Sequence, residues 1–262
     1  MPIAFYENIY YNITNANFYI KRKDITMGAL KYKRILLKLS GEALAEGGNG
    51  LYNYDFVDTV AAKVKKCVDM GAEVAVVCGG GNIWRGRQGG KMDRVRADRM
   101  GMLATVMNAI ALQDAFISAG IETVVMTAVP IQGVGQTYNR DEAIAHLEKG
   151  RVVIFGAGTG SPYFTTDTTA LLRAAEIKAD ASLFAKNIDG VYTADPRKDP
   201  TAVKLDSITY DRIITERLGV IDLTAATFGM ENKMTVLLFG LADPENIVRA
   251  VSGGKLGTLL TI

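Results

Sequence analysis

Hydrophobic positions form two kinds of pattern that alternate from residue 34 onward. Short apolar runs, such as RILLKL at 34–39 and EVAVVC at 73–78, are typical of strands that are buried on both faces. Between these two runs, from residue 56 to residue 68, apolar side chains recur every three or four positions, as one face of a helix requires. The alternation predicts strand–helix–strand units.

Glycines mark the predicted helix ends. Gly71, Gly120 and Gly150 each follow a helical pattern and precede a run of branched residues, where a glycine can adopt the left-handed conformation. Further strands are expected at 123–126, 152–155, 181–185, 235–239 and 257–262. Further helices are expected at 98–118, 141–149, 167–177, 210–218, 223–231 and 244–251.

This order predicts an α/β fold with a mostly parallel central sheet that helices cover on both faces. Ligands of such sheets bind beyond the carboxyl ends of the strands. We find no repeat and no long linker, so we expect one domain over residues 27–262. Residues 1–26 are rich in Asn, Tyr and Ile and lack the pattern of a signal peptide, so we expect a disordered extension or a segment upstream of the usual start at Met27. An extra edge strand is the alternative.

Charge and composition exclude several classes of function. The 262 residues include 30 basic and 28 acidic ones, a net charge of +2, which gives no argument for binding nucleic acid or an anionic membrane. There is no uninterrupted run of about 18 apolar residues, so no membrane span is expected. Cys67 and Cys78 are the only cysteines, which argues against a disulfide framework and for a cytoplasmic protein.

Four loops at the expected carboxyl edge have unusual content. They are KLSGEAL at 38–44, CGGGNIWRG at 78–86, GAGTGSPYFTTD at 156–167 and KNIDGVYTADP at 186–196. The P-loop and dinucleotide-binding fingerprints are both absent. Glycines nevertheless let backbone N–H groups converge on an oxyanion, and a following helix N-terminus adds a favourable dipole. Any one of these loops could also be a simple tight turn.

Each candidate side chain in these loops has a structural alternative. Lys38 could extend to solvent, but at the carboxyl edge it is better placed to hold a phosphate. Arg85 is either a solvated loop arginine or a charge aimed at a triphosphate. Asp98 could favour the first turn of a helix, and Asp195 could be turn chemistry. Thr166 or Asp167 could be an N-cap, which does not explain the whole hydroxyl cluster at 159–166.

Other kinds of catalysis lack their residues. His146 is the only histidine and lies just before the Gly150 helix end, where it is better explained as a solvated or capping residue. A histidine-based triad and a zinc site are therefore disfavoured, and no G-x-S-x-G sequence occurs. The remaining lysine, arginine, glycine amides, hydroxyls and aspartates suit phosphoryl transfer.

These motifs resemble those of the bacterial UMP kinases (uridylate kinases) of the amino acid kinase family. The resemblance rests on KRILLKLSGEAL, GGGNIWRG, ADRMGMLATVMNA, GAGTGSPYFTTDTTALLRAAEI, DGVYTADPRKDP and IDLTA, in this order, and extends from about residue 32 to the end. It implies a three-layer αβα sandwich and transfer of the γ-phosphoryl group of MgATP to UMP in pyrimidine nucleotide biosynthesis. It also implies Mg²⁺ held mainly by ATP phosphates, activation by GTP, inhibition by UTP and a homohexamer.

The resemblance also implies roles for individual residues. Catalytic roles fall to Lys38, Arg85 and to Asp222, which would orient the catalytic lysines. ATP contacts fall to Lys38, Leu39, Ser40, Gly41, Gly81, Arg85, Lys186, Tyr192 and Asp195. UMP contacts fall to Gly80, Asp98, Thr159, Gly160, Ser161, Pro162, Tyr163, Phe164, Thr165 and Thr166, with Asp98 on the ribose.

The chain departs from the family pattern at two places. Lys186 or Asn187 stands where many members have an ATP-contacting Thr or Asn, and the segment tied to GTP activation, AEGGNGLYNYD, is short and rich in glycine. We also expect Gly79, Gly80 and Gly81 to lack side chains because the transferring phosphoryl group passes beside them. Two alternatives remain: a family member that phosphorylates a small carboxylate or carbamate, and a binding or storage protein.

Overall fold

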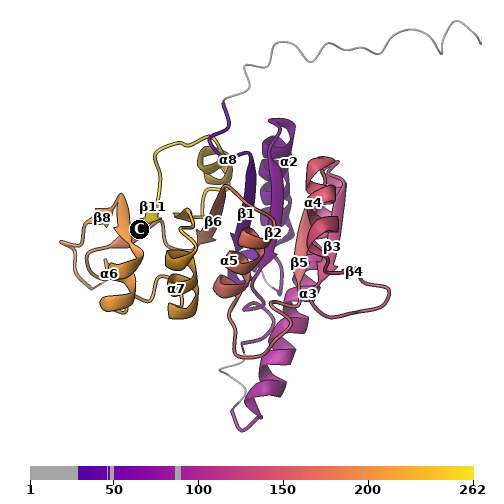
Figure 1. Ribbon diagram of the computed structural model, residues 1–262, viewed down its shortest axis with the longest axis horizontal. Helices are drawn as coiled ribbons and strands as arrows, with labels where there is room; N and C mark the ends of the chain where they lie inside the picture. The colour runs from indigo at the N-terminus through magenta and orange to yellow at the C-terminus, as the bar shows by residue number, and fades with distance from the viewer. Residues whose placement is uncertain (1–28, 46, 48–49, 86–89, 197) are drawn as a thin grey trace, which may run out of the picture.

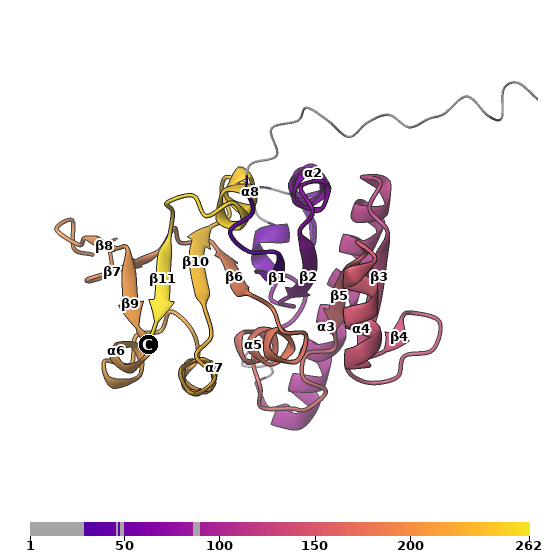
Figure 2. The same ribbon diagram turned by 45° about the horizontal axis from the view of Figure 1, so that its top comes forward.

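The computed structural model describes residues 29–45, 47, 50–85, 90–196 and 198–262. Its largest element is a nine-stranded sheet with the strand order β4-β3-β5-β2-β1-β6-β10-β11-β9. Helices lie on both faces of this sheet (Figures 1 and 2), which gives the predicted three-layer α/β architecture. The expectation for residues 1–26 falls outside the described residues, and the proposed domain boundary stays a prediction.

The bounds of the elements follow the hydrophobic pattern closely. The sheet contains β1 (Arg34–Leu39), β2 (Glu73–Cys78), β3 (Thr123–Thr127), β4 (Gln136–Thr137), β5 (Val152–Gly156), β6 (Ala181–Lys186), β9 (Ser207–Thr209), β10 (Val236–Gly240) and β11 (Thr258–Thr261). The helices are η1 (Glu42–Leu44), α2 (Tyr54–Asp69), α3 (Arg94–Ser118), α4 (Arg140–Glu148), α5 (Thr166–Glu176), α6 (Tyr210–Thr215), α7 (Leu223–Glu231) and α8 (Glu245–Val251). Two short strands, β7 (Val191–Tyr192) and β8 (Lys204–Leu205), pair separately.

The central strand β1 is where the strand order reverses. The chain proceeds from β1 to β2 on one side and later returns to place β6 on the other side, and all three strands are parallel. Only β10 and β11 pair in the antiparallel sense within the nine-stranded sheet of the described residues. The reversal leaves a crevice beyond the carboxyl ends of β1, β2 and β6, where ligands of open α/β sheets bind.

Two hydrophobic cores hold the layers together. Side chains of α2, α3 and α8 pack on one face of the sheet, and side chains of α4, α5, α6 and α7 pack on the other. Neighbouring positions of one strand serve opposite cores: Leu37 faces the α2 side and Leu36 faces the α5 side. Strands buried on both faces account for the nearly continuous apolar runs in the sequence.

Two features differ from the prediction. Helix α3 begins at Arg94 rather than Asp98, because the side chain of Asp93 caps it by accepting a hydrogen bond from the backbone N–H of Arg96. The short strands β4, β7, β8 and β9 were not predicted, since two or three residues carry too little periodicity. The predicted helix ends are confirmed: Gly71, Gly120 and Gly150 have φ of 93°, 78° and 76°.

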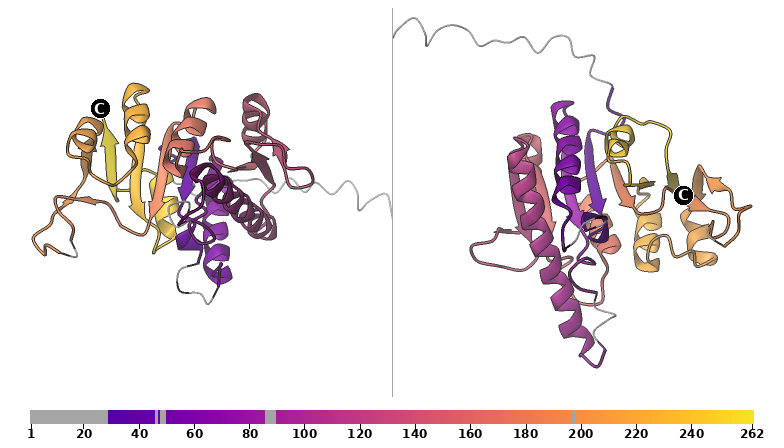
Figure 3. Two further views of the ribbon diagram at one scale, coloured as in Figure 1. Left: turned by 90° about the horizontal axis from the view of Figure 1, so that it is seen from below. Right: turned by 180° about the vertical axis from the view of Figure 1, so that it is seen from behind.

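Helix α3 is also the one described helix whose length and composition would allow it to cross a membrane. Figure 3 shows it lying beside α2 and extending beyond it. One side of α3 packs into the α2 core through Ala109, Leu112 and Phe116. The core helix of a soluble protein satisfies the same criterion, so this feature carries no membrane argument.

Candidate functional site

Two cavities open at the carboxyl edge of the sheet and meet at Lys38, Ser40 and Glu42. The first, of about 310 Å³, is lined by the loop after β2, the inner face of α3 and the segment that leads into α5. The second, of about 630 Å³, is lined by the loop after β6 and extends to Tyr192 and Pro196. All four loops that the sequence singles out therefore contribute to the linings of two adjoining cavities.

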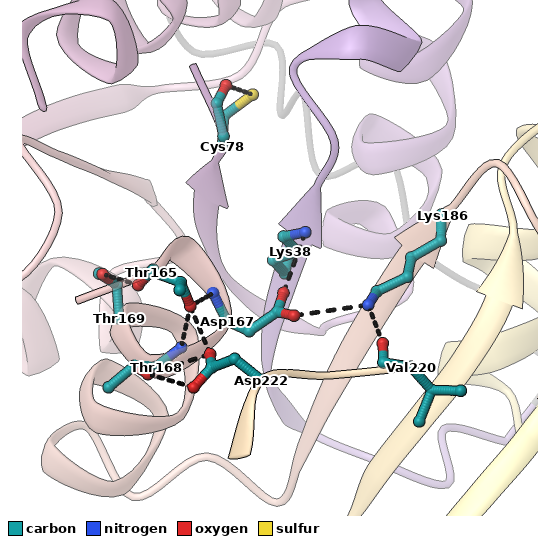
Figure 4. A network of polar contacts seen from close by, with 10 residues as sticks. Lys38, Cys78, Thr165, Asp167, Thr168, Thr169, Lys186, Val220 and Asp222 are labelled. Atoms are coloured by element: carbon teal, nitrogen blue, oxygen red, sulfur yellow. Dashed lines mark hydrogen bonds and ion pairs between the residues drawn. The ribbon is translucent and has the colours of Figure 1, made fainter. Parts of the chain in front are cut away.

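A carboxylate holds two lysines at the junction. Asp167, in the first turn of α5, lies 3.1 Å from the Nζ of Lys38 and 3.4 Å from the Nζ of Lys186 (Figure 4). Lys186 also donates a hydrogen bond to the carbonyl of Val220. Lys38 is only 9% exposed, so it does not extend into solvent. The two ammonium groups come from adjacent parallel strands, β1 and β6, and together form a compact cationic centre.

Burial and charge act in opposite directions on these groups. Burial by itself would raise the pKa of Asp167, but the ammonium groups of Lys38 and Lys186 outweigh it, so this pKa lies below the usual value for an aspartate. Burial lowers the pKa of Lys186, the charge of Lys38 lowers it further, and Asp167 opposes both. The centre thus has an ionised carboxylate and an ammonium group that loses its proton more readily than a surface lysine.

Asp222, which the resemblance implies would orient the catalytic lysines, is close enough for its charge to raise the pKa of Lys186, but its hydrogen bonds go elsewhere. Its carboxylate caps α7 by accepting the N–H of Ala225 at 3.0 Å, and it accepts hydroxyl hydrogen bonds from Thr165 and Thr168. The carboxylate that contacts both lysines is Asp167 instead. Asp222 fixes the start of α5, and through it the position of Asp167.

The N-cap of α5 is Thr165, one residue before the predicted Thr166 or Asp167. The hydroxyl oxygen of Thr165 accepts hydrogen bonds from the N–H groups of Asp167 and Thr168, at 3.1 and 3.3 Å. Thr169 donates back to the carbonyl of Thr165 at 2.9 Å. Part of the hydroxyl cluster therefore has a structural role, which frees the carboxylate of Asp167 to face the lysines.

The glycines of the loop after β2 differ in how closely their surroundings pack: a Cβ on Gly79 would meet nothing nearer than 3.4 Å. A Cβ on Gly80 would lie 2.8 Å from the Cβ of Ala104 and 3.0 Å from the carbonyl oxygen of Gly101, both in α3. A Cβ on Gly81 would lie 2.9 Å from a carboxylate oxygen of Glu42. Close packing against α3 therefore accounts for the missing side chain at Gly80, whereas the flexible side chain of Glu42 could move away at Gly81. The expectation that the transferring phosphoryl group passes beside these glycines stays a prediction.

The loop after β1 packs tightly against the same glycines. The N–H of Gly79 donates to the carbonyl of Leu39 at 3.0 Å. A Cβ on Gly41 would overlap the carbonyl oxygen of Gly79 and lie 2.7 Å from the Oδ1 of Asn82. Ser40 and Gly41 line the first cavity, whereas Leu39 is fully buried and lines neither cavity.

Arg85, which lines neither cavity, forms an ion pair with Glu42. About half of each side chain is exposed, so the pair is open to exchange with an anionic ligand. Glu42 lines both cavities and was not selected from the sequence, where it is the acidic residue of an ordinary helical turn.

The expected UMP segment forms the outer wall of the first cavity. Asp98 accepts hydrogen bonds from the backbone N–H of Tyr163 at 2.9 Å and from the Nε of Arg94 at 2.8 Å. Ser161 donates its N–H to the hydroxyl of Thr159 at 3.2 Å, and Gly160, with φ of 86°, lies against the carbonyl of Ala128. The lining of the first cavity includes four residues of this segment, Ser161, Phe164, Thr165 and Thr166. It does not include Pro162 and Tyr163, which lie in the same turn.

The second cavity ends at Tyr192, whose hydroxyl donates to Asp189 at 2.8 Å. Asp189 also accepts from Lys204 at 3.1 Å, which links the loop after β6 to β8. Asp195 accepts the N–H groups of Lys198 and Asp199 through its backbone carbonyl, each at 2.9 Å, in a turn next to Pro196. Lys186, whose ammonium group lies 3.4 Å from Asp167, also lines this cavity.

The sequence profile of the amino acid kinase family matches residues 33–239. The chain belongs to the amino acid kinase family. Its structure is similar to that of a UMP kinase from Bacillus anthracis, with 36% identity, coverage of 88% of this chain and 96% of that chain, and a TM-score of 0.85. A UMP kinase from Ureaplasma parvum matches with 35% identity, 89% and 100% coverage and a TM-score of 0.83. The uridylate kinase from Archaeoglobus fulgidus matches with 31% identity, 87% and 99% coverage and a TM-score of 0.68.

Membership in this family and the similarity to UMP kinases make the chain an ATP-dependent phosphotransferase. His146 lies on α4, outside both cavities, where its Nε2 is 3.3 Å from Gln136 and its Nδ1 is 3.2 Å from Arg151. In the part of the chain that the structure describes, no three His, Cys, Asp or Glu side chains come together as metal ligands.

Proposed function

We propose that this chain is a UMP kinase that transfers the γ-phosphoryl group of MgATP to UMP and gives ADP and UDP. The observation that carries the proposal is the pair of cavities that meet at Lys38. The second cavity would hold ATP, the first would hold UMP, and their phosphates would meet beside Lys38. The similarity to UMP kinases over 87–89% of the chain supports this assignment.

The acceptor would need no general base. The second pKa of a phosphate monoester is about 6, so UMP is mostly a dianion at neutral pH and is ready to attack. The protein would mainly position the two phosphates and neutralise charge on the transferring group. Lys38 would contact the transferring group, the amides of Gly80 and Gly81 would face the phosphates, and Arg85 would exchange Glu42 for the donor phosphate.

Mg²⁺ would supply further charge neutralisation. This hard ion prefers oxygen ligands and keeps much of its water shell. Glu42, at the junction, is paired with Arg85. Asp167 and Asp222, close to the junction, are occupied by lysines and by hydroxyl groups respectively. The residues therefore fit an ion that ATP phosphates and water hold, with little direct contribution from protein side chains.

Asp98 is the residue that would distinguish a nucleotide acceptor from a small acid. It lies at the wall of the first cavity, and its side chain is only 14% exposed. A carboxylate there suits a ribose hydroxyl, which can donate a hydrogen bond, and would repel an acceptor that is itself a carboxylate. This observation favours UMP over glutamate-like acceptors.

Self-association would use the outer face of α3. An apolar stripe at helical spacing is exposed there, with Leu103 at 54%; its members are Met100, Leu103, Met107, Ile110 and Ile117. Monomeric soluble proteins rarely leave such a continuous stripe in water. A second copy of the chain that packs on this stripe would form the dimer unit of the expected homohexamer. The same proposal includes activation by GTP, inhibition by UTP, a role in pyrimidine nucleotide biosynthesis and a cytoplasmic location.

A coupled assay of ADP release tests the reaction directly. MgATP is offered with UMP, CMP, dUMP, acetylglutamate, glutamate or carbamate, and selective turnover of UMP is the expected result. Turnover of a carboxylate without UMP would show that the pocket takes another acceptor. ATP binding without any turnover would favour a storage or sensing protein.

Replacement of Lys38 by alanine is expected to lower kcat by on the order of a hundredfold or more, because an oriented charge at the transferring group is lost. Near-normal turnover in that variant would refute the proposed arrangement. Thermal unfolding of the variant is measured in parallel to show that it is folded.

A further inference from the structure

Two asparagine side chains form a reciprocal amide pair behind the glycine loop. Asn108 of α3 donates through its Nδ2 to the Oδ1 of Asn82 at 2.8 Å, and Asn82 donates through its Nδ2 to the Oδ1 of Asn108 at 3.1 Å. Asn108 also donates to the carbonyl of Gly79 at 2.6 Å, and Asn82 donates to the carbonyl of Leu51 at 2.9 Å. The pair thus joins α3, the glycine loop and the loop before α2.

The burial of Asn108 makes this pair costly unless it is fully bonded. Asn108 is 0% exposed, and Ala109 and Leu112, close to it in α3, belong to the hydrophobic core. Burying an amide without partners costs about 1–3 kcal/mol in proteins. Both hydrogens of its Nδ2 and its Oδ1 have partners, so the network is satisfied. An apolar side chain would fill the space without this requirement but could not orient the backbone of the loop.

The bond from Asn108 fixes the peptide between Gly79 and Gly80. The C=O and N–H of a trans peptide point in opposite directions, so holding the carbonyl of Gly79 toward α3 directs the N–H of Gly80 away from it. The carbonyl of Gly80 is fixed as well, because it accepts the N–H groups of Ile83 and Trp84 at 3.0 and 2.9 Å. Within the described residues, the N–H of Gly80 has no hydrogen-bond partner, and Gly80 lines the first cavity.

We propose that the Asn82–Asn108 pair is a positioning device that aims the N–H of Gly80 at a phosphate oxygen of the bound nucleotide. Asn108 acts through the Gly79 carbonyl and touches no substrate. Asn82 keeps Asn108 in the orientation that presents its N–H to Gly79. This inference rests on the proposed function and adds to it the residues that set the geometry of the glycine loop.

The variant that tests the pair is Asn108→Asp. It preserves the size of the side chain and the acceptor for Asn82, but a carboxylate cannot donate to the carbonyl of Gly79 and repels it. A misplaced reacting group can cost about a hundredfold in rate, so kcat at pH 8 is expected to fall by on the order of tenfold to a hundredfold. At lower pH the carboxyl group can take up a proton and donate again, so the ratio of variant to wild-type kcat should rise as pH falls.

Leu112→Ala provides the matched control. Leu112 is fully buried one helical turn after Asn108 and does not line either cavity. Its truncation should lower the stability by about 2–5 kcal/mol, while kcat stays within about twofold at a temperature where the variant is folded. Asn82→Ala should lower kcat less than Asn108→Asp does, and the double variant should lose less than the product of the two single losses.

Binding is measured separately through Trp84, the only tryptophan of the chain, which lines the first cavity. Its fluorescence should report weaker UMP binding in Asn108→Asp. Absence of turnover by the wild-type protein would count against the proposed function, and the pair would then be judged on nucleotide binding. If Asn108→Asp keeps wild-type kcat and UMP affinity, or loses them only in step with its Tm as a merely destabilised protein would, the positioning role is refuted.

Discussion

Replacing Asp167 by asparagine would test the cationic centre most directly, because the substitution preserves shape and removes the charge between Lys38 and Lys186. The carboxylate lies 3.1 and 3.4 Å from the two ammonium groups. At an effective dielectric constant of about 20, each pair corresponds to roughly 5 kcal/mol of attraction before desolvation is subtracted. Without the carboxylate of Asp167, the ammonium groups of Lys38 and Lys186 would lie close together with no negative charge between them.

The loss of stability in Asp167→Asn has an upper limit, because Lys38 or Lys186 can release a proton and so remove the repulsion between them. Neutralising a lysine with an ordinary pKa of about 10.4 at pH 8 costs about 3 kcal/mol, since each pH unit corresponds to about 1.4 kcal/mol. We therefore expect Asp167→Asn to destabilise the protein by about 3 kcal/mol, in line with other buried pairs that lose one partner. For a chain of this size the corresponding drop in Tm is about 6–12 °C.

The pH dependence gives a second check with a definite sign. Asp167 has a lowered pKa, so in the wild type its stabilisation is present above the usual aspartate range and is lost only as pH falls through the lowered value. In the variant, releasing a proton from a lysine becomes easier as pH rises. The difference in Tm between wild type and variant should therefore narrow from pH 7 to pH 9.

Differential scanning calorimetry at several pH values measures both effects, and the ADP-release assay should show kcat reduced by on the order of a hundredfold. Asp206→Asn serves as the control, because Asp206 pairs with Lys255 on the surface, where both side chains are mostly exposed. That variant should stay within about 0.5 kcal/mol of wild type. A Tm within about 2 °C of wild type for Asp167→Asn at every pH would show that the carboxylate does not hold the lysines together.

Three further outcomes are expected. Because the pKa of Lys186 is lowered, Lys186 should lose its charge at a less alkaline pH than an ordinary lysine, and kcat/KM for MgATP should fall with it. Lys186→Arg keeps its charge and should remove this fall, so a pH profile that is the same in the variant and the wild type would contradict the reasoning. Asp98→Ala should raise KM for UMP by on the order of tenfold or more with a smaller change in KM for ATP, and equal changes in the two would argue against a ribose contact. Leu103→Glu should dissociate the oligomer in light-scattering measurements, whereas Val203→Glu, at a similarly exposed hydrophobic position outside the stripe, should not.

The fold could be predicted because its strands carry a simple signal. Strands such as β2 are buried on both faces, and burial on both faces requires a continuous apolar run that is visible in any single sequence. Helix ends were equally accessible where glycine adopts a positive φ, as at Gly71. The start of α3 could not be predicted correctly, because both Asp98 and Asp93 are compatible with the beginning of a helix, and only the structure shows that Asp93 is the cap.

The site could be predicted only in part, because its contacts join segments that are distant in sequence. Lys38 stood out as a charge at the end of an apolar run. Asp167 did not stand out as a partner of lysines, because an aspartate in the first turn of a helix is already explained by its favourable interaction with the helix dipole. Asn108 lies within an apolar helix and shows its role only once the carbonyl of Gly79 is seen beside it. Local patterns identify side chains that depart from their surroundings, and folding decides what they contact.

The junction of the two cavities has a consequence for inhibitors. Since Lys38, Ser40 and Glu42 belong to both linings, the cavities proposed for UMP and ATP adjoin at that point. A single molecule that carries adenosine and uridine at the ends of one polyphosphate chain could occupy both cavities at once. Binding of its second half would be intramolecular, with an effective concentration in the millimolar range for a short linker. The junction at which the two phosphates are proposed to meet would thus let one tethered ligand exclude both substrates.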